Sequence, residues 1–340
     1  MSCLPIYHAS ETVSYFTFAA TIICNSLSII LTAFYSEKIF KTYRTLLIIF
    51  SASFLVFSFL EFLIKPFNHS YNYGYIFFSF NKEYLQSADI QAFIMALYIG
   101  LFNSVNSFFC VLFVYRYWAL IKSKYLVLFE GWNILIWPLY SLICGIITIY
   151  ILYEWTAPDE FTNNYMRDVL MERYGKEPEE TSGYHVIVYQ PCQDGELCIR
   201  FAGLIFISFT TFLMSMSTIV VAYCAYNMHH QMNEMLKTCS VTNQRLQRQF
   251  FKALLLQSTA PLFTFFIPVG FIFGMLFSKM EFDFPTGFVF SSFGIYPALD
   301  SIILMTVVQE YRNAFFQFLR IRRRDGRSTN VTSTHQSDMA

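Results

Sequence analysis

The chain has 340 residues, of which 55% are hydrophobic and 14% are charged, and its formal net charge is zero. A soluble domain carries about 25% charged residues, so this composition excludes an ordinary soluble protein and indicates one that lies in a membrane. We expect membrane lipids around the chain and no nucleic acid among its partners.

Seven apolar stretches are long enough to cross a membrane. A helical span takes about 20 apolar residues, because every backbone polar group must find its partner within the span. The stretches are Val13–Tyr35, Leu46–Ile64, Ile90–Tyr115, Ile134–Tyr153, Phe201–Tyr226, Ala253–Phe277 and Phe288–Val308. The sequence therefore predicts an all-α membrane protein, a bundle of seven transmembrane helices over residues 13–309 that follows a short extracellular segment, 1–12.

The distribution of Lys and Arg predicts the orientation of the bundle. Of the 23 Lys and Arg, sixteen fall in one alternate set of connections and the tail, and seven fall in the other set. Cytoplasmic connections carry the excess of these residues, so we expect the amino terminus outside and the carboxyl terminus inside. Residues 1–12 hold no Lys or Arg, so we expect no cleavable signal peptide, and the first span serves as the insertion signal.

The longest connection, residues 154–200, is acidic and is predicted to be the second outer loop. Within it, residues 158–175 have apolar residues at helical spacing, and Asp159 or Thr162 could cap a short helix there. Further on, Cys192 and Cys198 flank an Asp-Gly turn in "CQDGELC", so a local disulfide is sterically reasonable. Free thiols or a link to Cys3 are the alternatives.

A glycosylation sequon, Asn68-His69-Ser70, follows the second span. The predicted topology places it on the first outer loop, where the glycosylation machinery can reach it. We therefore expect a glycan on Asn68.

Polar residues recur along two of the spans. The fifth span carries Ser208, Thr211, Ser215 and Thr218 at helical spacing, and helix packing explains such a stripe best. A stripe in the third span leaves two interpretations open, because its side chains could bond to a neighbouring helix or line a ligand pocket. The candidate pocket residues on this stripe are Asn103, Asn106, Ser107 and Cys110.

Charged residues mark both ends of the bundle. Glu61 precedes Lys65 by four residues, so we expect the two to pair along one helix face at the outer interface, with a ligand contact as the alternative. Arg116 closes the third span on the inner side, where it either snorkels to the interface or has a functional role. At the start of the sixth span, basic residues that share one helix face could bind an acidic partner or lipid phosphates. They are Arg245, Arg248 and Lys252.

Two spans contain prolines that interrupt helical hydrogen bonding. Pro261 and Pro268 lie seven residues apart in the sixth span, which predicts a kinked and movable helix. In the seventh span, Tyr296 and Asp300 flank Pro297 and share one helix face.

Asp300 lies in the inner half of the seventh span, too deep for a ligand that arrives from outside. We therefore expect it to act as a switch, bonded to Asn25 of the first span or to Arg116 in one of two states. A neutral structural Asp is the alternative.

The remaining sequence carries no pattern of enzymatic chemistry. There is no cluster at metal-ligand spacing and no glycine-rich phosphate loop, so we expect no metal, no cofactor and no catalytic residue. Residues 310–324 predict an amphipathic helix on the anionic inner leaflet, and 325–340 predict a disordered cytoplasmic tail.

Several segments together resemble the nematode seven-transmembrane chemoreceptors of the Str class. They are "FVYRYWAL" (113–120), "TAPDEFTNNYMRDVLMERYG" (156–175), "LQRQFFKALLLQSTAPLFTFFIP" (246–268), "YPALD" (296–300) and "YRNAF" (311–315). The resemblance covers nearly the whole chain. It implies an odorant receptor in the ciliary membrane of a sensory neuron that serves olfaction and chemotaxis through a Gi/o-like heterotrimeric G protein.

The resemblance also implies roles for single residues. Arg116 takes the place of the arginine that ends the third helix of rhodopsin-like receptors, and Pro268 resembles the kinking proline of their sixth helix. Tyr296 to Asp300 stand where those receptors have Asn-Pro-x-x-Tyr. A ligand-gated cation channel or a secondary transporter with seven spans is the rival interpretation.

Overall fold

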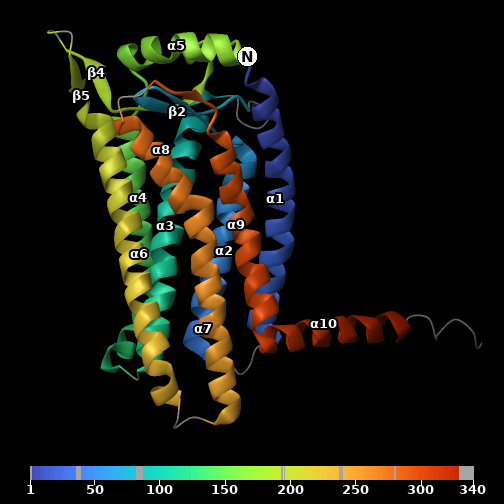
Figure 1. The fold of residues 1–340 in the computed structure, drawn as a ribbon. Coiled ribbons are helices and arrows are strands. Elements are labelled where there is room, and N and C mark those ends of the chain that lie inside the picture. The colour runs from blue at the N-terminus through green and yellow to red at the C-terminus, as the bar shows by residue number, and fades with distance from the viewer. Residues whose placement is uncertain are drawn as a thin grey trace, which may run out of the picture.

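A bundle of long helices with a layered cap at one end makes up the protein (Figure 1). The computed structural model describes residues 2–35, 40–81, 87–121, 123–192, 194, 196–236, 240–278 and 281–328. The predicted tail beyond residue 328 therefore lies outside the described residues. So do five of the lysines that predicted the orientation, namely Lys38, Lys82, Lys122, Lys237 and Lys279.

Seven helical segments form the bundle, as predicted. They are α1 (Leu4–Ile30) with a π-helical end, η1 (Leu31–Tyr35), α2 (Lys41–Ile64), α3 (Ala88–Leu120), α4 (Ile136–Trp155), α6 (Phe201–Leu236), α7 (Val241–Pro261) with its continuation η5 (Leu262–Phe266) and α8 (Ile267–Phe277), and α9 (Gly287–Val307). Within the described residues six are long and apolar enough to span a membrane, and α9 has a shorter apolar part, Phe293–Val307. α1 begins at Leu4, so most of the predicted extracellular segment 1–12 is helical.

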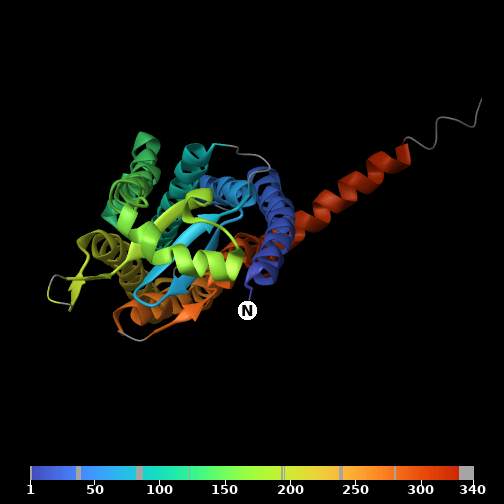
Figure 2. The same ribbon diagram turned by 90° about the horizontal axis from the view of Figure 1, so that it is seen from above.

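Figure 2 shows the bundle from above, with α3 between α2, α4 and α6. α3 buries the largest share of its apolar length, 56%, inside the protein. Gly100 permits this close packing, because a Cβ there would meet side-chain and backbone atoms of α4, among them the carbonyl oxygen of Gly145 at 2.8 Å. Residues on α3 are therefore the natural place to look for an interior site.

The cap consists of a four-stranded antiparallel sheet beneath the helix α5 (Glu160–Tyr174). The strands are β1 (Phe67–Tyr71), β2 (Gly74–Ser79), β3 (Ser182–Ile187) and β6 (Asp283–Phe284), in the order β3-β2-β1-β6. α5 confirms the predicted helix, and Asp159 is its cap, accepting from the backbone N–H of Thr162 at 2.8 Å. A separate hairpin, β4 (Tyr189–Pro191) and β5 (Leu197–Ile199), carries the predicted disulfide between Cys192 and Cys198.

Alternation along β2 explains why the sheet is buried on both faces. Tyr75 and Phe77 pack into the main core of the bundle, whereas Ile76 and Phe78 join a second core with residues of α5. Successive side chains of a strand point to opposite faces, so this single strand seals the bundle below and holds α5 above. The cap is thus a two-layered cover over one end of the bundle.

The sixth span contains a π-helical turn between its prolines. η5 begins directly after Pro261 and ends two residues before Pro268. Each proline lacks a backbone N–H and so removes one hydrogen bond of the helix. The backbone bonding of this span is therefore altered about midway along its length.

Helix α10 (Gln309–Ser328) turns away from the bundle at the end opposite the cap (Figure 1). It covers the predicted amphipathic helix 310–324 and continues to Ser328. Buried Tyr311 anchors it, because its hydroxyl lies 2.7 Å from Oγ1 of Thr32.

Candidate functional site

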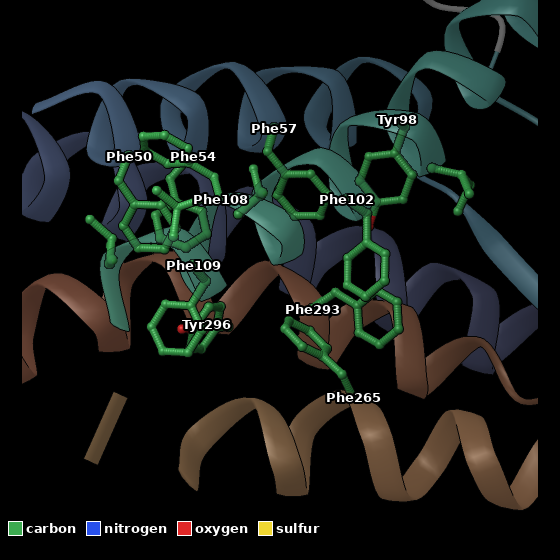
Figure 3. Close-up of a cluster of buried hydrophobic side chains, with 14 of the residues drawn as sticks. Phe50, Phe54, Phe57, Tyr98, Phe102, Phe108, Phe109, Phe265, Phe293 and Tyr296 are labelled. Carbon is green, nitrogen blue, oxygen red and sulfur yellow. The ribbon is translucent and has the colours of Figure 1, made fainter. Parts of the chain in front are cut away.

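A cluster of buried aromatic side chains lies inside the bundle (Figure 3), and several of them enclose a cavity. Its volume is about 20 Å³, so it holds little more than one water molecule. Its walls are Phe50, Phe54 and Phe57 of α2, Phe102, Val105, Asn106 and Phe109 of α3, Pro261 and Phe265 of the sixth span, and Tyr296 of α9. The third, sixth and seventh of the predicted spans thus line this cavity together with the second.

A larger chamber of about 190 Å³ adjoins this cavity, with Asn106 and Phe109 as common lining residues. Hydroxyl groups from α6 and α7 line it, namely Ser217, Thr218, Ser258 and Thr259. The chamber brings the predicted third, fifth and sixth spans together. A small molecule with an apolar body and one polar group suits such a lining.

The polar stripe on α3 divides between the two expected roles. Asn103 donates from Nδ2 to Oγ1 of Thr148 on α4 at 3.1 Å, so it serves helix packing. Asn106 lines both the cavity and the chamber, and its Nδ2 is buried without a hydrogen-bond partner among the described residues. Ser107 is buried, and Cys110 lies beside Cys224 of α6. Asn106 is therefore the stripe residue that borders open space inside the bundle.

Tyr296 connects the cavity to a network of hydrogen bonds. Its ring lines the cavity, and its hydroxyl donates to the carbonyl oxygen of Gln257 on α7 at 3.2 Å. The Tyr296 hydroxyl also lies 3.4 Å from Oδ1 of Asp300. Nε2 of Gln257 in turn donates to the backbone carbonyl of Asp300 at 3.3 Å. The shared face predicted for Tyr296 and Asp300 is thus present, and it joins α9 to α7.

The partners predicted for Asp300 are not the ones found in this structure. Asn25 donates to the carbonyl oxygen of Pro297 at 3.0 Å and accepts from Ser301 at 3.0 Å. The reason is rotational: positions 297 and 301 face α1, whereas Tyr296 and Asp300, one residue earlier on the helix, face α7. Asn25 therefore binds the residues that follow Tyr296 and Asp300, namely Pro297 and Ser301.

Arg116 is buried at the end of the bundle opposite the cap. Its guanidinium carbon lies 3.5 Å from the ring centre of Tyr43 and 4.1 Å from that of Phe250. Nη1 donates to Oε1 of Gln247 at 3.0 Å, while Nε and Nη2 have no hydrogen-bond partner among the described residues. This arrangement ties α3 to α7 and excludes simple snorkelling.

Arg116 and the three basic residues of α7 do not share a site in this structure. Arg245, Arg248 and Lys252 are exposed, whereas Gln247 and Phe250 of the same helix face Arg116. Helical periodicity separates these two faces. The sequence prediction treated the basic residues as one cluster and missed Gln247 and Gln257, although both stand out as amides beside or within an apolar run.

Two predictions near the cap are wrong. Asn68 is 1% exposed, lines a small cavity beneath the sheet and donates to Oγ1 of Thr286 at 2.6 Å, so this fold leaves no room for a glycan on its side chain. Glu61 does not face Lys65 along α2. It lies against Gly294 of α9, and Lys65 ends α2 in a left-handed conformation that points its amine to Glu11, 3.8 Å away.

Comparisons with known proteins agree on the identity of the fold and the family. A family profile described as "Serpentine type 7TM GPCR chemoreceptor Str" matches residues 10–316. The G-protein coupled receptor str-33 of Caenorhabditis elegans is 34% identical over 307 residues, which are 90% of this chain and 89% of the relative. The serpentine receptor class r-10 of the same species is 31% identical, over 82% of this chain and 81% of its own.

Among solved structures, squid rhodopsin superposes with a TM-score of 0.60 over 93% of this chain and 86% of its own, at 11% sequence identity. That likeness concerns the fold, a bundle of seven transmembrane helices. The family consists of receptors and not of enzymes. The chain belongs to the Str family of seven-transmembrane G-protein-coupled chemoreceptors, and it is a multi-pass membrane protein.

Proposed function

We propose that the protein is an odorant receptor in the ciliary membrane of a sensory neuron. A small environmental chemical binds between α3, α6 and α7 and activates a Gi/o-like heterotrimeric G protein, in the service of olfaction and chemotaxis. The observation that carries this proposal is the position of Tyr296. One side chain both lines the central cavity and holds α9 to α7 through the carbonyl of Gln257.

The proposed ligand site is the chamber beside Asn106, extended into the central cavity. In this structure the cavity is too small for an organic molecule, so occupancy must move aromatic rings. Phe265 and Tyr296 are in edge contact, with ring centres 5.3 Å apart, at the boundary between the sixth span and α9. A ligand that separates them favours the arrangement in which Tyr296 leaves Gln257, and its preference for that arrangement sets the size of the response.

The proposed output lies at the other end of the same helix. When α7 moves, Gln247 leaves Arg116. Arg116 and the exposed basic residues of α7 then become available together to an acidic surface of the G protein; these residues are Arg245, Arg248 and Lys252. The cap end is extracellular in this proposal, which agrees with its disulfide, because disulfides persist on the oxidising side of a membrane.

A reporter assay tests the proposal. Cells that express the chain with a Gi/o-type G protein are screened with volatile and water-soluble chemicals, and the responding chemical is titrated on two variants. Asn106→Leu is expected to raise the half-maximal concentration at least tenfold, because it removes the amide that faces the chamber. Asn227→Leu, the same change on the exposed part of α6, is expected to leave it unchanged.

Two results would contradict the proposal. One is a receptor at the cell surface that gives no G-protein-dependent response to any chemical but conducts ions or carries solute in pure liposomes, as a channel or transporter does. The other is an equal response from both variants and the unchanged receptor.

A further inference from the structure

Among the described residues, the sheet of the cap and α5 cover the bundle from above. Strands β2 and β3 are buried along their whole length between α5 and the helices. Polar contacts fasten the layers together, since His69 of β1 lies 2.8 Å from both Tyr174 of α5 and Asp283 of β6. Arg173 of α5 also forms an ion pair with Asp283.

An opening exists instead on the side of the bundle, between α6 and α8. This lateral crevice has a volume of about 490 Å³. Its lining residues are Thr211, Met214, Ser215, Thr218 and Ile219 of α6 and Leu262, Phe266, Val269, Gly270 and Phe273 of the sixth span. The stripe that we assigned to packing in the fifth span therefore borders an unfilled space.

The crevice is continuous with the candidate ligand chamber. Thr218, Leu262 and Phe266 line both of them, and Asn106 then lines both the chamber and the central cavity. Three adjoining spaces thus lead from the lipid-facing surface to Tyr296.

The π-helical turn η5 forms the wall along this series of spaces. Leu262 and Phe266 face the crevice, whereas Phe265 between them is 6% exposed and faces the central cavity. π-helical turns occur often at functional sites, and the prolines on either side of this one, Pro261 and Pro268, each remove a backbone hydrogen bond from the span. The wall is therefore the part of the span that can move at the least cost in hydrogen bonds.

The chemistry of the crevice indicates its occupant. Hydroxyl groups that faced only lipid would find no further hydrogen-bond partner there. The hydroxyl of Thr218 already donates to the carbonyl oxygen of Met214 at 2.8 Å, so its oxygen remains available as an acceptor. At the inner end, Nδ2 of Asn106 is a buried donor without a partner among the described residues. An apolar molecule that carries an oxygen able to accept a hydrogen bond matches this series of surfaces.

We propose that the ligand reaches its site from within the bilayer, through the crevice between α6 and α8 and past Leu262 and Phe266. The ligand class is a small apolar molecule that partitions into lipid and has one hydrogen-bonding oxygen. This inference rests on the proposed ligand site, but its test needs neither the natural ligand nor a G protein.

A route governs rates and not equilibria. Narrowing the crevice slows the arrival and the departure of a molecule by the same factor, so its affinity is unchanged. Two glycines of α8 allow this to be tested, because a Cβ added at Gly270 or at Gly274 meets no atom within 4 Å. Gly270 lines the crevice. Gly274, one turn further along α8, serves as the matched control.

The experiment measures access to position 106 in the full chain, reconstituted in lipid nanodiscs. All cysteines except Cys192 and Cys198 are replaced by alanine, and Asn106→Cys is introduced. The apolar reagent N-phenylmaleimide and the charged reagent 2-(trimethylammonium)ethyl methanethiosulfonate are then compared. We expect the apolar reagent to react at least tenfold faster relative to its rate with a free thiol.

Gly270→Trp adds bulk inside the crevice and is expected to slow the reaction of the apolar reagent with the cysteine introduced at position 106 at least fivefold. Gly274→Trp adds the same bulk outside the crevice and is expected to leave that rate unchanged. Thr218→Phe narrows the same crevice from α6 and provides an independent second block, which carries the test if Gly270→Trp does not fold. Equal rates in all three variants would overturn the proposal and leave the crevice as a seat for lipid chains. So would rapid reaction with the charged reagent, which would indicate a watery path through the cap.

Discussion

The carboxyl group of Glu61 on α2 lies directly against the backbone of Gly294 on α9. A Cβ at position 294 would overlap both carboxylate oxygens, and Oε2 has no hydrogen-bond partner among the described residues. Glycine at this position is what lets a buried carboxyl group stand between two helices.

We expect Gly294→Ala to destabilise the receptor by about 1–3 kcal/mol, the usual cost of overpacking a closed interior. The melting temperature in detergent measures this. Gly270→Ala is the control, because its surroundings are open and alanine in a helix there gains about 0.5–1 kcal/mol. The double change Glu61→Ala, Gly294→Ala should recover much of the loss. A Gly294→Ala protein that melts like the unchanged one would show that α2 and α9 separate easily.

Basal signalling should depend on the bond between Tyr296 and Gln257. We expect Tyr296→Phe and Asp300→Asn to alter basal G-protein turnover while the amount at the cell surface stays constant, because each changes the contact between α9 and α7. Nucleotide exchange on a purified G protein measures the effect. Thr306→Val alters an exposed hydroxyl that bonds only within α9 and should behave as the unchanged receptor does. If both variants merely fail to fold, or neither changes the turnover, Tyr296 and Asp300 are structural.

Gln247→Leu tests the contact between α7 and Arg116. Loss of the amide removes the hydrogen bond to the guanidinium, which then keeps only its contacts with the rings of Tyr43 and Phe250. We expect basal nucleotide exchange to rise severalfold, since the arrangement with α7 held close to α3 loses a bond to a charged group worth about 1.5–3 kcal/mol. Unchanged or lower basal exchange would mean that this contact does not restrain α7.

The cap should lose stability in mild acid because of His185. Burial lowers the pKa of this side chain to about 4, with Arg200 acting in the same direction and Asp159 opposing them. The unfolded chain therefore binds a proton first as the pH falls through the ordinary histidine pKa of about 6.5. Stability is complete above that pH and is lost progressively down to about pH 4, by about 2 kcal/mol at pH 5.

Melting temperatures between pH 7.5 and pH 5 check this, with His185→Asn expected to flatten the profile. His69 adds a smaller slope of the same sign, because burial lowers its pKa despite the hydrogen bond to Asp283. The hydrogen bond from Arg200 keeps the pKa of Asp159 below its usual range despite burial, so that carboxyl group contributes almost no slope above about pH 5. A His185→Asn profile as steep as that of the unchanged protein would assign the acid sensitivity to other groups.

The sequence allowed the spans to be predicted, because each must satisfy its own backbone in lipid and so is coded locally. α5 was predictable for the same reason, since its cap and its apolar spacing lie within one segment. The sheet of the cap was not, although "FNHSYNYGYIFFSF" contains a turn between aromatic runs. Its strands have two to six residues, and pairs such as Phe77 with Tyr184 join loops over a hundred residues apart.

For the candidate site, the sequence likewise indicated which residues are unusual but not which residues they contact. The sequence identified Asn106, Arg116, Tyr296 and Asp300 as unusual, because polar groups in a span are costly and few. It could not supply their partners, since adjacent positions on α9 differ by about 100° in direction and packing alone decides which one meets α1. The spacing of Glu61 and Lys65 predicted a local ion pair. The left-handed conformation of Lys65 at the end of α2 instead directs its side chain toward Glu11.

The strands of the cap come from the loops after α2, α4 and α8. The sheet therefore connects the neighbouring helix ends to one another through backbone hydrogen bonds. A helix that is held at one end is displaced most at its free end. In the activation that we propose, a small displacement beside the π-helical turn would therefore grow along the length of α7 toward the end of the bundle that carries α10. In that proposal, the cap that covers the bundle also holds one end of the moving helix in place.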